Sequence, residues 1–145
     1  MTPGEVAELL NSPLTAVLST LGADGSPHSA GMWFAADDAA VRMWTYAKSQ
    51  KAVNLRRDPR AAVLVEEGVA YDELRGVLVR GRVELVVDED AIAAIGRSLY
   101  ERYTLPRTGL PLEGPVLAEL LRQATKRVGI VLPLDDVASW DHGKL

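Results

Sequence analysis

The sequence of 145 residues contains no cysteine and only two histidines, His28 and His142. The absence of cysteine excludes disulfide bonds, thiol nucleophiles and thiolate-bound metals, and it argues against a disulfide-stabilised extracellular scaffold. With so few histidines a zinc site would need Asp or Glu ligands, and no HExxH-type spacing occurs. We therefore expect neither a structural nor a catalytic metal.

Long apolar runs and an excess of positive charge are missing as well. No apolar segment approaches the roughly 20 residues that span a bilayer. The first residues lack the basic start and apolar centre of a signal peptide, so we expect a cytoplasmic protein without a membrane partner. The formal net charge is −4, whereas nucleic-acid-binding proteins are normally basic, so a nucleic-acid partner is not expected either.

The composition, with 48% hydrophobic and 25% charged residues, is typical of a globular protein, and the length suits one domain over residues 1–145. Short strand-like segments joined by turn sequences predict an α+β, mainly β fold, namely a six-stranded antiparallel barrel with inserted short helices. The expected strands cover residues 14–21, 27–36, 41–46, 61–66, 74–87 and 127–132.

Helices are predicted where capping residues precede apolar positions at helical spacing. They begin near Pro3, cover Ser49–Asp58, follow the N-cap Asp88, and cover Val116–Gln123. The segment Thr104–Pro115 contains three prolines and two glycines, so we expect it to be a loop and a candidate lid.

Between Lys48 and Arg60 the sign of the charge is reversed, since five basic residues accompany one acid. Ser49 stands at the expected N-cap, where unpaired backbone N–H groups and the positive end of the helix dipole favour an anion. Lys51 lies in the same turn and Lys48 precedes it. This convergence of a hydroxyl, backbone donors and ammonium groups is typical of a phosphate monoester site. The alternative is a solvated basic helix face.

The segment Thr45–Pro59 resembles the cofactor-phosphate segment of the pyridoxamine 5'-phosphate oxidase-like split β-barrels. Lys51 and the run Asn54–Arg60 are more similar to the flavin/deazaflavin oxidoreductase branch, whose members often use the deazaflavin F420. The resemblance implies a homodimer that binds two cofactors in grooves between its subunits, with Ser49 and Lys51 at the cofactor phosphate.

The same resemblance bears on the choice of cofactor. The FMN-using oxidases carry arginine where this chain has Gln50, and a second arginine on the preceding strand near Gly31. Because both arginines are missing, we expect coenzyme F420 and keep FMN as the alternative.

Other residues are expected to complete the site. Trp33 is a candidate wall for a stacked ring, with packing in the core or in a dimer contact as the alternative. The backbone of Thr45 and Tyr46 is expected to flank that ring, and Asn54 either contacts the cofactor or occupies a solvated helix position. The predicted cofactor-binding set is Trp33, Thr45, Tyr46, Lys48, Ser49, Lys51, Asn54 and Arg57. No catalytic residue is singled out, and Trp140 and His142 are left open between a packed tail and a neighbouring subunit's site.

These expectations predict an F420-dependent oxidoreductase that transfers a hydride between the deazaflavin and an unsaturated small molecule. One alternative is an FMN-binding oxidoreductase of the same fold. Another is a carrier or storage protein that binds F420 without turnover, since no acid–base constellation excludes it.

Overall fold

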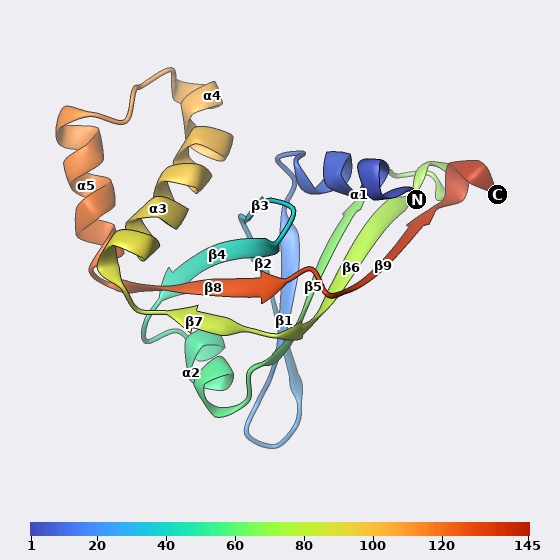
Figure 1. Ribbon diagram of the computed structural model, residues 1–145, viewed down its shortest axis with the longest axis horizontal. Coiled ribbons are helices and arrows are strands. Elements are labelled where there is room, and N and C mark those ends of the chain that lie inside the picture. The colour runs from blue at the N-terminus through green and yellow to red at the C-terminus, as the bar shows by residue number, and fades with distance from the viewer.

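In the computed structural model, which describes residues 1–145, two antiparallel sheets face each other and helices pack around them (Figure 1). One sheet has five strands in the order β2-β1-β5-β6-β9, and the other has four in the order β3-β4-β8-β7. The strands are β1 (Ala16–Leu21), β2 (Pro27–Met32), β3 (Ala35–Ala36), β4 (Ala40–Tyr46), β5 (Arg60–Glu67), β6 (Arg75–Arg82), β7 (Glu84–Val86), β8 (Arg127–Pro133) and β9 (Asp136–Asp141).

This architecture confirms the α+β split barrel, but the expected number of six strands is wrong because nine are present. The predicted strand 74–87 divides at Val83, whose N–H donates to the Pro59 carbonyl at 2.8 Å while the chain passes from one sheet to the other. The predicted strand 27–36 divides after Met32, and the tail beyond Pro133 forms β9 along β6.

The core lies between the two sheets. It is formed by every second side chain of their strands, because successive side chains point to opposite faces of a sheet. Along β1, Ala16 and Leu18 are buried while Val17 between them is exposed. The two sheets meet over fully buried side chains such as Phe34 and Met43. Because burial of one such side chain contributes about 1.5–3 kcal/mol, this alternation specifies which face of each strand turns inward.

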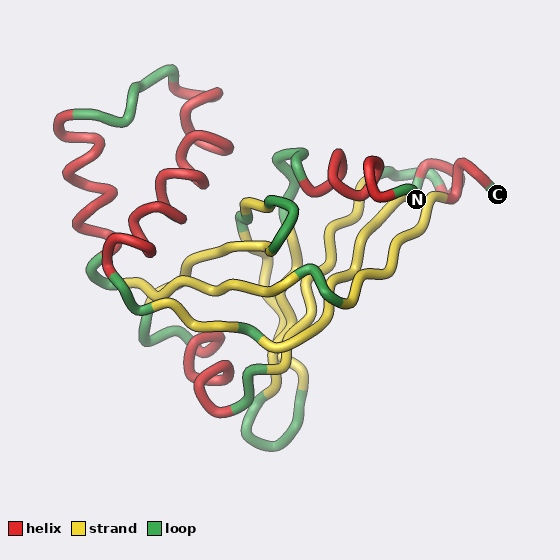
Figure 2. The backbone as a smooth tube through the Cα atoms, viewed as in Figure 1, coloured by secondary structure: helices red, strands yellow, loops and turns green.

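The five α-helices lie outside the barrel, as the tube in Figure 2 shows. They are α1 (Pro3–Leu10), α2 (Gln50–Arg57), α3 (Glu89–Leu99), α4 (Leu105–Thr108) and α5 (Gly114–Ala124). Helices α3 and α5 form a hairpin that packs on Trp44 of β4. Gly96 of α3 has no side chain, which leaves room for the Trp44 ring. None of the helices has the length and apolar character that a membrane span requires.

The expectation that Thr104–Pro115 is entirely a loop is wrong. A π-helix, Tyr100–Thr104, continues α3 directly into α4, and only residues 109–113 are free of helix. Pro106 stands in the first turn of α4, directly after the π-helix. Gly109, at φ 66°, ends α4 in the left-handed conformation that glycine adopts without strain.

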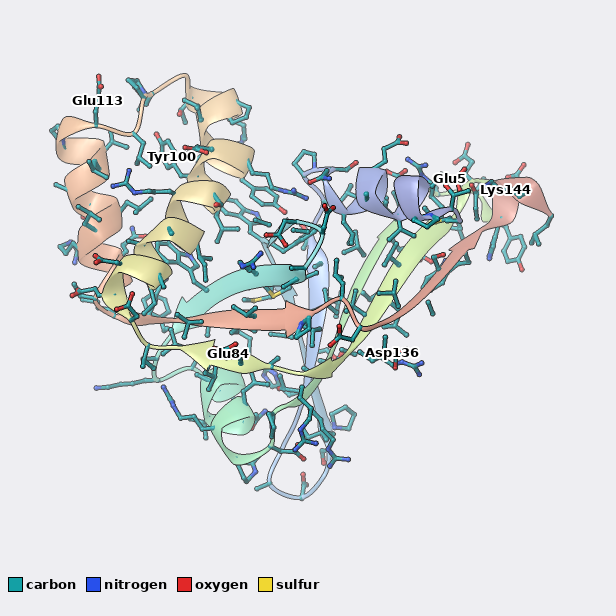
Figure 3. All side chains as sticks on the ribbon, in the orientation of Figure 1. Glu5, Glu84, Tyr100, Glu113, Asp136 and Lys144 are labelled. Atoms are coloured by element: carbon teal, nitrogen blue, oxygen red, sulfur yellow. The ribbon has the colours of Figure 1, made fainter.

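The chain termini lie side by side (Figure 1), and the expected extended tail is tied to the rest of the chain. Figure 3 shows Lys144 beside Glu5, and its ammonium group lies 2.7 Å from the carboxylate and lowers the pKa of Glu5 to about 2. Trp140 donates its ring N–H to Glu66 at 2.9 Å, and His142 Nδ1 lies 2.9 Å from the Tyr71 carbonyl. Both side chains thus make hydrogen bonds within the chain, and a contact with a neighbouring subunit stays a prediction.

Candidate functional site

Helix α2 begins as the sequence predicts, with Ser49 as its N-cap. The Ser49 hydroxyl accepts hydrogen bonds from the Ala52 N–H at 3.2 Å and from the Thr45 hydroxyl at 3.1 Å. The backbone N–H groups of Gln50 and Lys51 have no partner, because the residues four positions before them lie outside the helix. Two backbone donors are therefore free at the positive end of the helix dipole.

Two lysines add positive charge at this helix end. Lys48 is exposed and Lys51 is half-buried, and none of the ion pairs of the protein includes either ammonium group. Uncompensated ammonium groups beside free backbone N–H groups are suited to a phosphate, which accepts charge-assisted hydrogen bonds through several oxygens.

A cavity of about 340 Å³ opens next to this helix end, where β2 ends and β4 leads into α2. Its lining includes Trp33, Thr45 and Tyr46, so the structure brings together the three residues predicted to flank a cofactor ring. Trp33 is 48% exposed and stacks on Tyr103 with ring centroids 4.7 Å apart. Thr45 lines this cavity and also donates a hydrogen bond to Ser49. This bond links the aromatic cavity to the first turn of α2 with its free N–H groups, which we call the anion end of α2.

Asn54 and Arg57 lie elsewhere on the same helix. The alternative that Asn54 is solvated is wrong, because its side chain is fully buried and donates to the Thr20 hydroxyl at 3.1 Å. Its carbonyl oxygen accepts from the side chains of Gln50 at 2.8 Å and Arg57 at 3.2 Å. Arg57 also donates to the Leu21 carbonyl at 2.5 Å. Residues spaced by three and four share a helix face. On this face Asn54 is buried, whereas Gln50 and Arg57 are exposed. A cofactor contact of either side chain stays a prediction.

The other arginines of the basic segment are also engaged within the chain. Arg56 donates to the Ala47 carbonyl at 2.7 Å. Arg60 pairs with Asp58 at 2.8 Å and lowers the pKa of that carboxyl to about 2. Arg60 lies opposite Arg82 on β6, and with Arg80 these residues line a groove of about 470 Å³ on the five-stranded sheet. Sequence reasoning did not find this groove, because the register between strands brings its residues together.

Sequence reasoning also missed Arg127 and Trp44. Arg127 opens β8 opposite Tyr46, and its guanidinium lies 4.4 Å from the Tyr46 ring centroid and 4.5 Å from that of Trp44. Both Arg127 and Trp44 line the 340 Å³ cavity. No local pattern marks them, since β4 and β8 are neighbours only in the folded chain.

Comparison with known proteins places this geometry in a family. The family model described as pyridoxamine 5'-phosphate oxidase matches residues 2–136. Among solved structures, the conserved hypothetical protein Rv2991 from Mycobacterium tuberculosis is 42% identical, with a TM-score of 0.89 over 99% of this chain and 87% of the other. A structure described as an F420 reductase is 30% identical, with a TM-score of 0.72 over 94% of this chain and 98% of the other.

More distant structures share the fold alone. The haem storage protein HutZ from Vibrio cholerae is 15% identical, with a TM-score of 0.70 over 94% of this chain and 92% of the other. No curated protein sequence matches the chain. The match of the family model over most of the chain and the likeness to both nearer structures show that the chain belongs to the pyridoxamine 5'-phosphate oxidase family, a family of flavin-binding split barrels.

Proposed function

We propose that the protein is an F420-dependent oxidoreductase that acts on an unsaturated small molecule. The observation that carries this proposal is the link through Thr45 between the free donors at the start of α2 and the aromatic cavity. Coenzyme F420 has the matching parts, a phosphate and a planar deazaflavin ring. The similarity to a structure described as an F420 reductase supports the same cofactor.

The residues of this chain fit such a cofactor. When bound, the deazaflavin would supply hydride transfer, which no amino-acid side chain can perform. Lys51, Lys48 and the backbone N–H groups beside Ser49 would hold the phosphate, and Trp33 would form one wall for the ring. The hydroxyl of Tyr103 is engaged with the Phe34 N–H at 3.2 Å and the Leu14 carbonyl at 2.7 Å. Tyr103 is therefore not assigned as the proton donor, and water can supply the product proton.

Two positions favour F420 over FMN. Gln50 stands where the FMN oxidases have arginine. Its side-chain amide donates a hydrogen bond at 2.8 Å to the side-chain carbonyl of Asn54, one turn further along α2. Gly31 lines the 340 Å³ cavity and has no side chain that could reach a ligand there. Neither position offers the guanidinium that binds the FMN phosphate in the related oxidases.

A titration of the purified protein with F420 and with FMN, followed by fluorescence, tests the cofactor. We expect F420 to bind at least tenfold more tightly than FMN, because both arginines of the FMN site are missing. Tight FMN binding without F420 binding would contradict the proposal. If F420 binds, oxidation of the reduced form by a panel of enones and quinones is expected, and its complete absence would favour the carrier function.

We also propose that the cofactor sites lie in a homodimer. An apolar row crosses the outer face of the five-stranded sheet, because Val17, Leu64, Leu78 and Ala138 are neighbours in register on four adjacent strands. Exposed apolar rows of this kind favour burial against a second sheet, and a second copy of the chain offers the same row.

Analytical ultracentrifugation tests this assembly. We expect a particle of twice 15.7 kDa, and we expect Leu64→Lys to shift it to the monomer, because two lysines would meet in the apolar contact. The control is Leu121→Lys, which places the same charge on the exposed side of α5 and should leave the dimer intact. A monomeric wild-type protein would contradict the proposed interface.

A further inference from the structure

A second cavity, of about 280 Å³, lies between α3, α5 and β4. It shares four lining residues with the first cavity, so the two adjoin. The shared residues are Trp33, Trp44, Leu99 and Arg127. The first cavity lies next to the anion end of α2, whereas the second lies beneath the helical hairpin. The pair thus provides separate space for a cofactor ring and for a second planar molecule.

The guanidinium of Arg127 stands where the two cavities meet. It is held against the rings of Trp44 and Tyr46, at 4.5 and 4.4 Å from their centroids. One of its five N–H groups donates to the Gln123 side chain at 3.0 Å. Stacking on two rings restricts the guanidinium, so it is preorganised to donate from its edge.

Arg127 has no anionic partner within the chain. None of the ion pairs of the protein includes it, and its only side-chain hydrogen bond is to the neutral amide of Gln123. A half-buried guanidinium gains most from a carboxylate, which accepts two parallel hydrogen bonds from it. The missing counter-ion is therefore expected to come from a ligand.

The other walls favour a flat, conjugated molecule. The rings of Trp33 and Trp44 line the second cavity, and one face of Trp33 is stacked on Tyr103. Gly96 allows the Trp44 ring to lie against α3, because a side chain there would overlap that ring. Aromatic walls stack well on planar π-systems.

The helical hairpin closes the far side of the cavity. Figure 3 shows Tyr100 between α3 and α5, and its hydroxyl donates to the Leu110 carbonyl at 2.7 Å, which ties the α4–α5 link to the end of α3. Tyr100 begins the π-helix, a distortion that occurs frequently at functional sites. The link between α4 and α5 is thus hydrogen-bonded to the end of α3, which lines the cavity.

We propose that the second cavity binds a planar, conjugated carboxylate, with its anionic group on Arg127 and its π-system against Trp33 and Trp44. The assignment rests on the proposed function in one respect, since it makes this molecule the hydride acceptor. The binding itself depends only on the cavity and on Arg127.

Calorimetric titration of the full chain with cinnamate and with cinnamamide tests the proposal, since the two probes differ in charge at nearly equal size. We expect cinnamate to bind at least tenfold more tightly than cinnamamide. Arg127→Gln should lower cinnamate affinity at least tenfold and leave cinnamamide affinity unchanged, and Arg127→Lys should restore part of the loss. The control Arg107→Gln removes a charge from the exposed surface of α4 and should leave both affinities unchanged.

The outcomes separate this proposal from the proposed cofactor. Equal affinity for the two probes, or unchanged cinnamate binding in Arg127→Gln with an intact thermal transition, would overturn the carboxylate site. A loss of F420 affinity alone in that variant would overturn it too and assign Arg127 to the cofactor. If cinnamate binds as expected while F420 does not bind at all, the cofactor proposal fails and the carboxylate site stands.

Discussion

Lys51→Ala is expected to weaken F420 binding about 10- to 100-fold. The ammonium group of Lys51 has no partner within the chain. It would therefore donate a charge-assisted hydrogen bond to the phosphate without breaking another interaction. A hydrogen bond to a charged group contributes about 1.5–3 kcal/mol, which corresponds to roughly 10- to 100-fold in affinity. The measurement is the fluorescence titration, performed at low and at high salt, because screening should narrow the difference between variant and wild type.

Two further variants sharpen this test. Lys51→Arg keeps the charge and should retain most of the affinity. Arg97→Ala removes the same charge from the exposed side of α3 and should bind F420 like the wild type. The unfolding free energy of Lys51→Ala should change by no more than about 0.5 kcal/mol, as is usual for a partly exposed side chain without partners. Wild-type affinity in Lys51→Ala would remove Lys51 from the phosphate site.

Asn54→Ala is expected to lower the free energy of unfolding by about 2–3 kcal/mol. The fully buried amide of Asn54 connects α2 to β1 through Thr20 and accepts hydrogen bonds from Gln50 and Arg57. Its removal leaves the buried Thr20 hydroxyl without this partner and leaves a small void beneath the helix. Urea denaturation measures the change, and an unchanged m-value would show that the unfolding transition itself is the same.

The control for Asn54→Ala lies one residue earlier. Val53 is 43% exposed on the same helix, so Val53→Ala should cost no more than about 0.5 kcal/mol. If both variants were equally stable, the buried amide would not hold α2 on the barrel. At a temperature where Asn54→Ala is fully folded, its F420 affinity also tests the predicted cofactor contact.

What the sequence determined by itself depends on short-range interactions. The N-caps at Ser49 and Asp88 were predictable, because a capping side chain and the N–H that it accepts are only three residues apart. The alternation of β1 and the basic start of α2 are local in the same sense. The fold class followed from such segments together with the resemblance at Thr45–Pro59.

Only the tertiary structure decided the features that depend on contacts between distant segments. Val83 divides a strand because it meets the Pro59 carbonyl, and Asn54 is buried because β1 lies beneath its helix. Arg127 reaches the rings of Trp44 and Tyr46 because β8 pairs with β4 in one register, in which Tyr46 lies opposite Arg127. Such registers result from packing between segments tens of residues apart, which no spacing along the chain records. The anion end of the site was thus determined locally, whereas the cavities beside it exist only in the folded chain.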